Sequence, residues 1–321
     1  QVTPQSHSNY CQTFLSLNSA LGCTYLDELP KMCGYDCQNR TTGARLLRNN
    51  RAVSYLKSQG YRLVAFATGD GATEWRQADE YLAPYHSLGD FGQMLLEQTP
   101  LPKLYGWLGK TGAWSAYDAH RQRIQFALGK LPEVASEPGP KFVFAHLVCP
   151  HPPFVFAPDG SSQQATWRYT LNDATNFISL AGPKGHRIYR EGYRDQILYL
   201  NRELKRILPQ ILARSTQPPI IILQGDHGPG NYLDWSSCDK SLVQERFSIL
   251  NAIFLPGPDA PRLPKDVSPV NTFRLIFKHY FGLELDPLPN RCYYSGHPFL
   301  YDFIDVTDRL DDPIPAEYLA P

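Results

Sequence analysis

One segment of the sequence, residues 219–230, constrains the fold of this chain more than any other. It reads Pro-Ile-Ile-Ile-Leu-Gln-Gly-Asp-His-Gly-Pro-Gly, an apolar run that ends abruptly in Asp226 and His227. A short β-branched run bounded by proline and glycine is typical of a fully buried strand in a parallel sheet. Ligands of open α/β sheets bind beyond the carboxyl ends of the strands, so we expect these two side chains to line a site there. A carboxylate and an imidazole in that place are suited to hold a metal ion.

The rest of the chain alternates helical and strand patterns. Helical spacing of apolar residues predicts helices over 13–21, 43–59, 118–131, 190–214 and 271–281. Buried strands are predicted over 61–68, 141–148, 220–223 and 250–255. Pro132 is expected to end the helix before it, and Pro209 to kink or interrupt the longest helix. This alternation predicts an α/β fold with a doubly wound, mainly parallel sheet flanked by helices.

Size, charge and cysteine content narrow the class of protein. The chain has 321 residues, with 31 Lys and Arg against 31 Asp and Glu, which argues against a nucleic-acid-binding protein and an electrostatic membrane anchor. No run of eighteen apolar residues occurs, and the opening residues look like the middle of a longer protein. The seven cysteines are either free thiols or partly paired in an oxidising compartment, with Cys33 and Cys37 as the leading local pair.

Three polar stretches lie at a predicted helix start or just beyond a predicted strand. They are Asn-Tyr-Cys-Gln-Thr at 9–13, Pro-His-Pro-Pro-Phe at 150–154 and Gly-Asp-His-Gly at 225–228. In this order the chain resembles the alkaline phosphatase superfamily. Within it, the chain is similar to the sulfatase-like branch that includes the lipoteichoic acid synthases and phosphoethanolamine transferases, and runs 245–251 and 268–274 share that likeness.

The resemblance implies roles for particular residues. Asp226, His227 and the nucleophile Thr13 would hold one divalent metal ion, and His151 matches the histidine that contacts the transferred group. The acid that the family supplies from its first strand has no counterpart here. We therefore expect one sulfatase-like catalytic domain over 1–321 that lacks its first strand through truncation. Mixed oxygen and nitrogen ligation favours Mn²⁺ or Zn²⁺, with Ca²⁺ or Mg²⁺ as alternatives.

Each of these residues also has a purely structural interpretation. Thr13 could cap its helix, and His151 could be a loop histidine among prolines. Asp226 could cap a turn and His227 could be a buried, hydrogen-bonded imidazole. Two arginines in the later runs, Arg246 and Arg274, are either contacts for an anion or ordinary surface residues.

The choice between sulfate and phosphate turns on the residues around Cys11. Sulfatases of this fold resemble one another in a Cys-x-Pro-x-Arg signature, but Cys11 is followed by Gln-Thr-Phe-Leu, without the proline or the arginine. A threonine-based reaction on phosphate esters fits better, with hydrolysis of sulfuric esters as one alternative. Another is a catalytically degenerate domain that binds a glycan or lipid headgroup. A mutase-type enzyme would need a second metal cluster, which the sequence does not show.

The resemblance also implies a location and a substrate class. Related transferases act outside the bacterial cytoplasmic membrane on lipid or glycan acceptors. We therefore expect an anionic ester substrate that is lipid- or glycan-linked, and a periplasmic or cell-surface domain. The full-length protein is expected to be anchored in the inner membrane through an N-terminal region that precedes this sequence.

Overall fold

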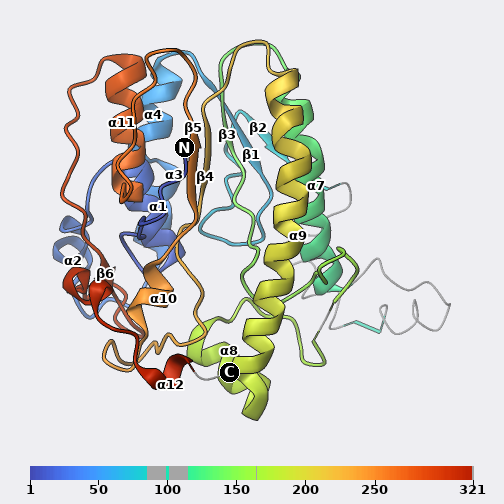
Figure 1. The fold of residues 1–321 in the computed structure, drawn as a ribbon, viewed down its shortest axis with the longest axis vertical. Coiled ribbons are helices and arrows are strands. Elements are labelled where there is room, and N and C mark those ends of the chain that lie inside the picture. The colour runs from blue at the N-terminus through green and yellow to red at the C-terminus, as the bar shows by residue number, and fades with distance from the viewer. Residues whose placement is uncertain (85–98, 101–114, 164, 320–321) are drawn as a thin grey trace. The chain divides into compact units, whose positions relative to one another are not determined.

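The computed structural model describes residues 1–84, 99–100, 115–163 and 165–319 (Figure 1). The chain divides into two compact units. The first comprises residues 1–59, 174–180 and 217–321, and the second comprises residues 60–173 and 181–216. Each is described by itself below. The expectation of a single catalytic domain over 1–321 stays a prediction.

The second unit contains the parallel sheet. Strand β1 (Arg62–Phe66) lies between β2 (Glu80–Leu82) and β3 (Lys141–Phe144) and runs parallel to both. The residues of β1 after Arg62 are buried and apolar, as expected of a parallel strand covered on both faces. The predicted α/β class, with a parallel sheet flanked by helices, is therefore confirmed.

Two long helices of the second unit lie side by side in Figure 1, α7 (Ala116–Ser136) and α9 (Gly185–Arg214). The turn η1 (Gly182–Lys184) precedes α9. Neither helix ends at its proline: α7 continues beyond Pro132, and α9 continues through Pro209. The expected stop at Pro132 is wrong because a proline removes only one backbone hydrogen bond, and burial of Pro132 and Val134 holds the last turns in place.

Three helices of the first unit pack against α1 (Thr13–Gly22). They are α3 (Thr41–Arg48), α4 (Arg51–Ser58) and α11 (Pro269–Phe281), and the short helix α2 (Glu28–Cys33) follows α1 in the chain. The single helix predicted over 43–59 is two helices, because the Asn50 side chain accepts a hydrogen bond from the Val53 amide, 2.9 Å away, and starts α4 afresh.

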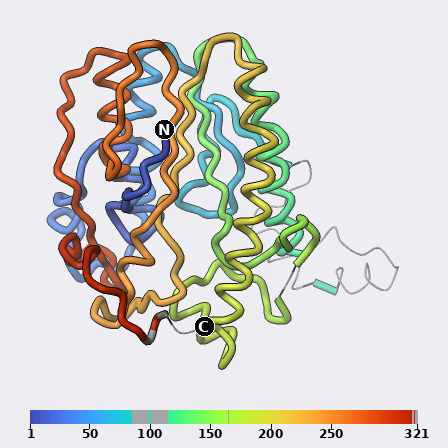
Figure 2. Tube along the Cα trace, in the orientation of Figure 1, coloured from blue at the N-terminus to red at the C-terminus, as the bar shows by residue number. Residues whose placement is uncertain are grey.

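In the first unit, the first residues of the chain lie beside the strand that pairs with β4. Strand β4 (Ile221–Gln224) is half-buried and pairs with β5 (Asn251–Phe254) in the antiparallel sense, unlike the strands of the second unit. The prediction of a fully buried strand in a parallel sheet is therefore wrong for this segment. The first residues of the chain run beside β5 (Figure 2). There the Ile253 amide donates to the Gln1 carbonyl and the Thr3 amide donates to the Asn251 carbonyl. The segment that leads into α1 is therefore fixed in the same unit as β4.

The remaining elements of the chain are short. They are α8 (Ala174–Ala181), α10 (Val243–Phe247), β6 (Tyr293–Tyr294), β7 (Ile304–Asp305), η2 (Thr307–Asp311) and α12 (Ala316–Leu319). Strands β6 and β7 form an antiparallel pair. Over the described ranges, no helix combines the length and the apolar character that crossing a membrane requires.

Candidate functional site

The Asp-His pair lies where β4 ends. The last residue of β4 is Gln224. The Gly225 amide donates to the Leu250 carbonyl at 2.8 Å, and this is the last backbone hydrogen bond between the two chain segments before Asp226. Beyond it, the Asp226 Oδ2 atom lies 3.4 Å from His227 Nε2. The two side chains are 18% and 9% exposed, so both are shielded yet reach the surface of the unit.

Thr13, which is far from Asp226 and His227 in the sequence, lies beside His227 in the structure. It is the first residue of α1, and its Oγ1 lies 3.1 Å from His227 Nε2. The capping position belongs to Gln12, which makes no side-chain cap, so the interpretation of Thr13 as a helix cap is wrong. The hydroxyl points instead at the imidazole, across 214 positions in sequence.

A backbone carbonyl sets the orientation of the His227 ring. The His227 Nδ1 atom lies 2.9 Å from the Gly228 oxygen. A carbonyl only accepts, so Nδ1 carries the proton and, in the neutral ring, Nε2 carries the lone pair. The Thr13 hydroxyl therefore donates to Nε2. The same lone pair is what a metal ion would use.

The donor atoms fit a divalent cation in part. The Nε2 atom lies 3.1 Å from Thr13 Oγ1 and 3.4 Å from Asp226 Oδ2. Two ligands of one tetrahedral ion, each bound at about 2.0–2.1 Å, lie roughly 3.3 Å apart. Within the described part of the chain no third His, Cys, Asp or Glu joins the pair. Three donors are thus at hand, and the remaining coordination positions need water, substrate or a further residue.

Gly228 is required by close backbone packing. A Cβ atom there would lie 2.2 Å from the Glu245 oxygen and 2.5 Å from the Ser248 oxygen, both at α10. Its amide donates to the Arg246 carbonyl at 2.7 Å. A side chain at this position would therefore push the loop away from α10 and displace His227.

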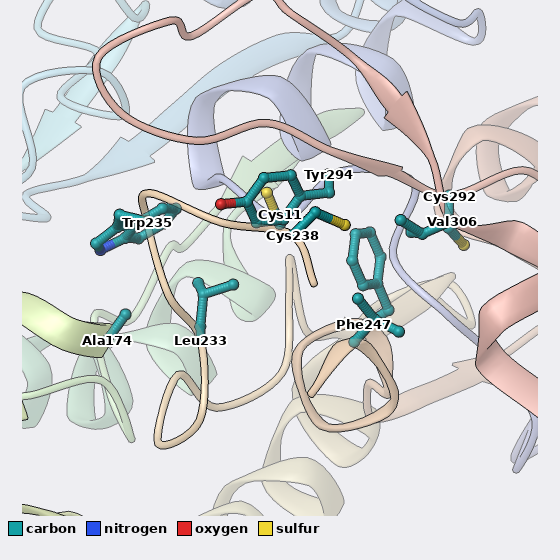
Figure 3. Packing of buried hydrophobic residues seen from close by; sticks show 10 residues of the cluster. Cys11, Ala174, Leu233, Trp235, Cys238, Phe247, Cys292, Tyr294 and Val306 are labelled. Atoms are coloured by element: carbon teal, nitrogen blue, oxygen red, sulfur yellow. The ribbon is translucent and has the colours of Figure 1, made fainter. Parts of the chain in front are cut away.

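Cys11 is a packing residue. Its Sγ lies 3.3 Å from the Ser295 carbonyl oxygen and 3.2 Å from the Ser295 amide nitrogen, and the side chain is fully buried. Figure 3 shows it in the apolar cluster with Cys238, Tyr294 and Phe247. This burial raises the pKa of the Cys11 thiol. All seven cysteines of the chain are free thiols in the structure.

His151 lies in the loop after β3, in the second unit. Its Nδ1 is hydrogen-bonded to the Pro152 carbonyl, and its Nε2 lies 3.8 Å from Asp173 Oδ2. The Asp173 carboxylate is buried and accepts a hydrogen bond from the Tyr189 hydroxyl at 2.7 Å. The Gln196 side chain donates to the His151 carbonyl at 3.3 Å and accepts from the Val155 amide at 2.8 Å. The histidine is therefore held by backbone and side chain alike.

The structure thus brings together three of the four predicted site residues, Thr13, Asp226 and His227, in the first unit. His151 belongs to the second unit. Asp173 was missed, since an isolated acid in a loop has no sequence signal. Arg246 is 2% exposed, which excludes the surface interpretation for it.

Comparison with known proteins agrees with this fold and supports membership of the alkaline phosphatase superfamily, to which the sulfatases belong. A family profile described as Sulfatase matches residues 34–247, and the chain belongs to the sulfatase family. Comparison with curated protein sequences finds no match.

Solved structures share the fold at low sequence identity. A protein from Bacteroides thetaiotaomicron named as a candidate sulfatase is 11% identical at a TM-score of 0.54 over 94% of this chain and 66% of that one. A 2-O GAG sulfatase is 12% identical at 0.52, again over 94% and 66%. A phosphonate monoester hydrolase from Silicibacter pomeroyi is 13% identical at 0.52, over 94% and 69%. The chain thus spans slightly less than two thirds of the first of these proteins.

Proposed function

We propose that this chain is the catalytic part of a metal-dependent hydrolase or transferase of phosphate or sulfate esters, with Thr13 as nucleophile. The observation that carries the proposal is the 3.1 Å contact between Thr13 Oγ1 and His227 Nε2 beyond β4. A threonine hydroxyl is a weak nucleophile until a neighbouring base or a metal activates it. Membership of the sulfatase family supports ester hydrolysis as the reaction class.

Each of these residues would have its own role in cleavage of the ester. The Gly228 carbonyl holds His227 so that Nε2 faces Thr13 Oγ1, and with a metal bound both atoms would ligate the ion in place of their mutual hydrogen bond. Thr13 begins α1, whose N-terminal amides favour the negative charge of a bound ester. Asp226, His227 and Thr13 would hold a divalent ion, Mn²⁺ or Zn²⁺, which when bound lowers the pKa of a hydroxyl and offsets phosphoryl charge.

His151 would donate a hydrogen bond from Nε2 to an oxygen of the transferred group. Because the Pro152 carbonyl accepts from Nδ1, Nε2 would donate from the ring that carries both protons. The Asp173 Oδ2 atom lies 3.8 Å from this Nε2. Donors aimed at the oxygens on which charge develops stabilise the transition state.

We favour a phosphate ester over a sulfate ester. The Cys11 side chain is buried in the apolar cluster, whereas the Thr13 hydroxyl reaches His227, so a cysteine-derived nucleophile does not suit this site. The fold itself supports neither ester, since its structural neighbours are named for both sulfatase and phosphonate hydrolase activity. Hydrolysis of sulfuric esters is the alternative.

We further propose an anionic ester that is linked to a glycan or a lipid, outside the bacterial cytoplasm. The resemblance to lipoteichoic acid synthases and phosphoethanolamine transferases supports this. One structural neighbour is named as a GAG sulfatase, which agrees with a glycan-linked substrate. Membrane anchoring of the full-length protein is part of the same proposal.

The test compares two substitutions at Thr13 with one elsewhere on α1. Full-length protein is assayed on p-nitrophenyl phosphate diesters and p-nitrophenyl sulfate with Mn²⁺ or Zn²⁺. We expect Thr13→Ala to lower kcat by about 10³-fold or more and Thr13→Ser to retain measurable turnover. Ser19→Ala, which removes a hydroxyl bound to the Thr24 carbonyl at the far end of α1, should leave kcat unchanged. Wild-type turnover by Thr13→Ala would end the assignment of the nucleophile.

A second candidate is a family member that binds the headgroup without catalysis. The observation in its favour is that the described residues supply no third acid or imidazole beside Asp226 and His227. Calorimetric titration with Mn²⁺ and Zn²⁺ separates the two. Binding of an anionic ester without turnover, under conditions where the metal is bound, would favour this second function.

A further inference from the structure

Arg246 occupies an unusual position for an arginine close to a candidate site. It lies in α10, is 2% exposed, and packs its guanidinium 5.5 Å from the centre of the Trp235 ring. A buried charge is costly unless polar groups and rings surround it. Its presence in the core therefore needs an explanation beyond packing.

Two backbone carbonyls on either side of the candidate site receive its hydrogen bonds. Arg246 Nε donates to the Cys11 oxygen at 2.9 Å, and Nη1 donates to the Gly228 oxygen at 3.0 Å. Cys11 lies two residues before Thr13, and Gly228 directly follows His227. The planar guanidinium thus bridges the segment that carries the hydroxyl and the loop that carries the imidazole.

The Gly228 oxygen is shared between this arginine and the His227 ring. It accepts from Arg246 Nη1 and lies 2.9 Å from His227 Nδ1. In return, the Gly228 amide donates to the Arg246 carbonyl. The carbonyl that orients His227 is therefore itself fixed by Arg246. A shift of that oxygen would turn Nε2 away from Thr13.

We propose that Arg246 is a positioning residue that sets the geometry between Thr13 and His227 by bridging the Cys11 and Gly228 carbonyls. It acts through other residues, and its Nε and Nη1 atoms are engaged by backbone, which argues against the anion contact considered from the sequence. The kinetic test of this role rests on the proposed function, because it needs a turnover to measure. The NMR test of the His227 ring does not depend on that function.

Arg274 offers a matched control within the same unit. It also bridges two backbone carbonyls, with Nε donating to Asp286 at 2.7 Å and Nη1 donating to Cys23 at 2.7 Å. Cys23 follows the last residue of α1, so this bridge lies at the opposite end of that helix from Thr13. Replacing either arginine by lysine keeps the charge but removes the fork that spans two oxygens.

The kinetic test compares Arg246→Lys with Arg274→Lys in the full-length protein. For Arg246→Lys we expect kcat to fall by about 10–100-fold while KM stays within about twofold, as for loss of a group that orients a site residue. Arg274→Lys should lower the melting temperature but keep wild-type kcat. A raised KM with wild-type kcat in Arg246→Lys would show an anion contact and overturn the proposal.

A measurement on the free protein separates this proposal from the proposed function. At alkaline pH, where imidazole is neutral, the Nδ1 proton of His227 held by Gly228 should give an NMR signal that His227→Ala removes. Arg246→Lys should weaken that signal through faster exchange with water, and Arg274→Lys should not. If the wild type turns over no ester, the proposed function fails, but this signal still decides the role of Arg246. An unchanged signal in Arg246→Lys would overturn it.

A second variant covers the case in which Arg246→Lys does not fold. Trp235→Leu removes the ring against the guanidinium and leaves both hydrogen bonds possible. We expect a smaller fall in kcat, of about threefold to tenfold, again with KM unchanged. A folded Trp235→Leu in which the His227 signal is weakened but kcat stays at the wild-type value would overturn the positioning role.

Discussion

The loop after β4 and the loop after β3 orient a histidine ring in the same way but pack against different surroundings. Each carries a histidine whose Nδ1 is bound to the carbonyl of the following residue, Gly228 for His227 and Pro152 for His151. In the β4 loop Nε2 then faces Thr13 Oγ1, and in the β3 loop it faces the Asp173 carboxylate. The device that fixes the ring is thus common to two loops in two separate units.

The surroundings of the two loops differ. The β4 loop packs against backbone, since a Cβ at Gly228 would overlap the Glu245 and Ser248 carbonyls. The β3 loop packs against side chains of α9, where Gln196 bridges its backbone and the Phe154 ring lies over Gly192. Backbone contacts adjust less than side chains do, so we expect the β4 loop to tolerate less change. The substitutions below test this comparison.

The largest expected difference is in activity. We expect His227→Ala to lower kcat/KM by about 10³-fold or more, since it removes the partner of Thr13 and the proposed metal ligand. We expect His151→Ala to lower it by about 10²-fold, since it removes the proposed donor to the transferred group. Steady-state kinetics on the substrate found for the wild type measures both. An equal or larger loss in His151→Ala would reverse the ranking of the two loops.

The next difference is in stability. Gly228→Ala should lower the free energy of unfolding by about 3 kcal/mol, the upper end for overpacking, because rigid carbonyls meet the new methyl group. Gly192→Ala should lower it by only about 1 kcal/mol, because a clash with the Phe154 side chain of about 2 kcal/mol is partly offset by the roughly 1 kcal/mol by which alanine favours a helix over glycine. Urea unfolding measures both.

Gly225→Ala is the control for the β4 loop. The nearest atom to a Cβ there is Ile249 Cβ at 3.4 Å, so we expect a change within about 0.5 kcal/mol. A similar loss for Gly225→Ala and Gly228→Ala would show that the loop responds to any side chain and not to the carbonyls of α10.

The smallest effect concerns pH and the second unit. His120 on α7 is 1% exposed, and its pKa is lowered from 6.5 to about 3, mainly by burial and to a smaller extent by Arg123 and His151. The unfolded chain therefore binds a proton that the folded chain refuses between pH 6.5 and about 3. The resulting stability is fully present above pH 6.5 and is lost as the pH falls, by about 1.4 kcal/mol at pH 5.5.

His120→Phe should remove this dependence. We expect its free energy of unfolding to change less between pH 7 and pH 5.5 than that of the wild type. Urea unfolding at several pH values measures the difference in slope. Equal slopes would mean that His120 takes up its proton in the folded chain.

Local pattern predicted most of the elements but not their pairing. The apolar run before Gly225 correctly predicted a strand, and the glycines and prolines that follow correctly predicted where it ends. The antiparallel pairing of β4 with β5 depends on contacts between residues 27 to 33 positions apart. The course of residues 1–8 beside β5 depends on contacts across about 250 positions. Sequence spacing carries no record of such contacts. Proline was misjudged for a related reason, since packing around Pro132 outweighed a local rule.

The sequence by itself determined which residues carry the candidate chemistry: a hydroxyl at a helix start and an acid and an imidazole at a strand end. Residue type, the spacing of apolar residues and the positions of glycine and proline are local properties, so the sequence alone reveals them. Only the tertiary structure decided that Thr13 Oγ1 and His227 Nε2 lie 3.1 Å apart, that Cys11 is buried, and that Arg246 bridges two carbonyls. Distance, burial and hydrogen-bond partner belong to pairs of residues brought together by folding.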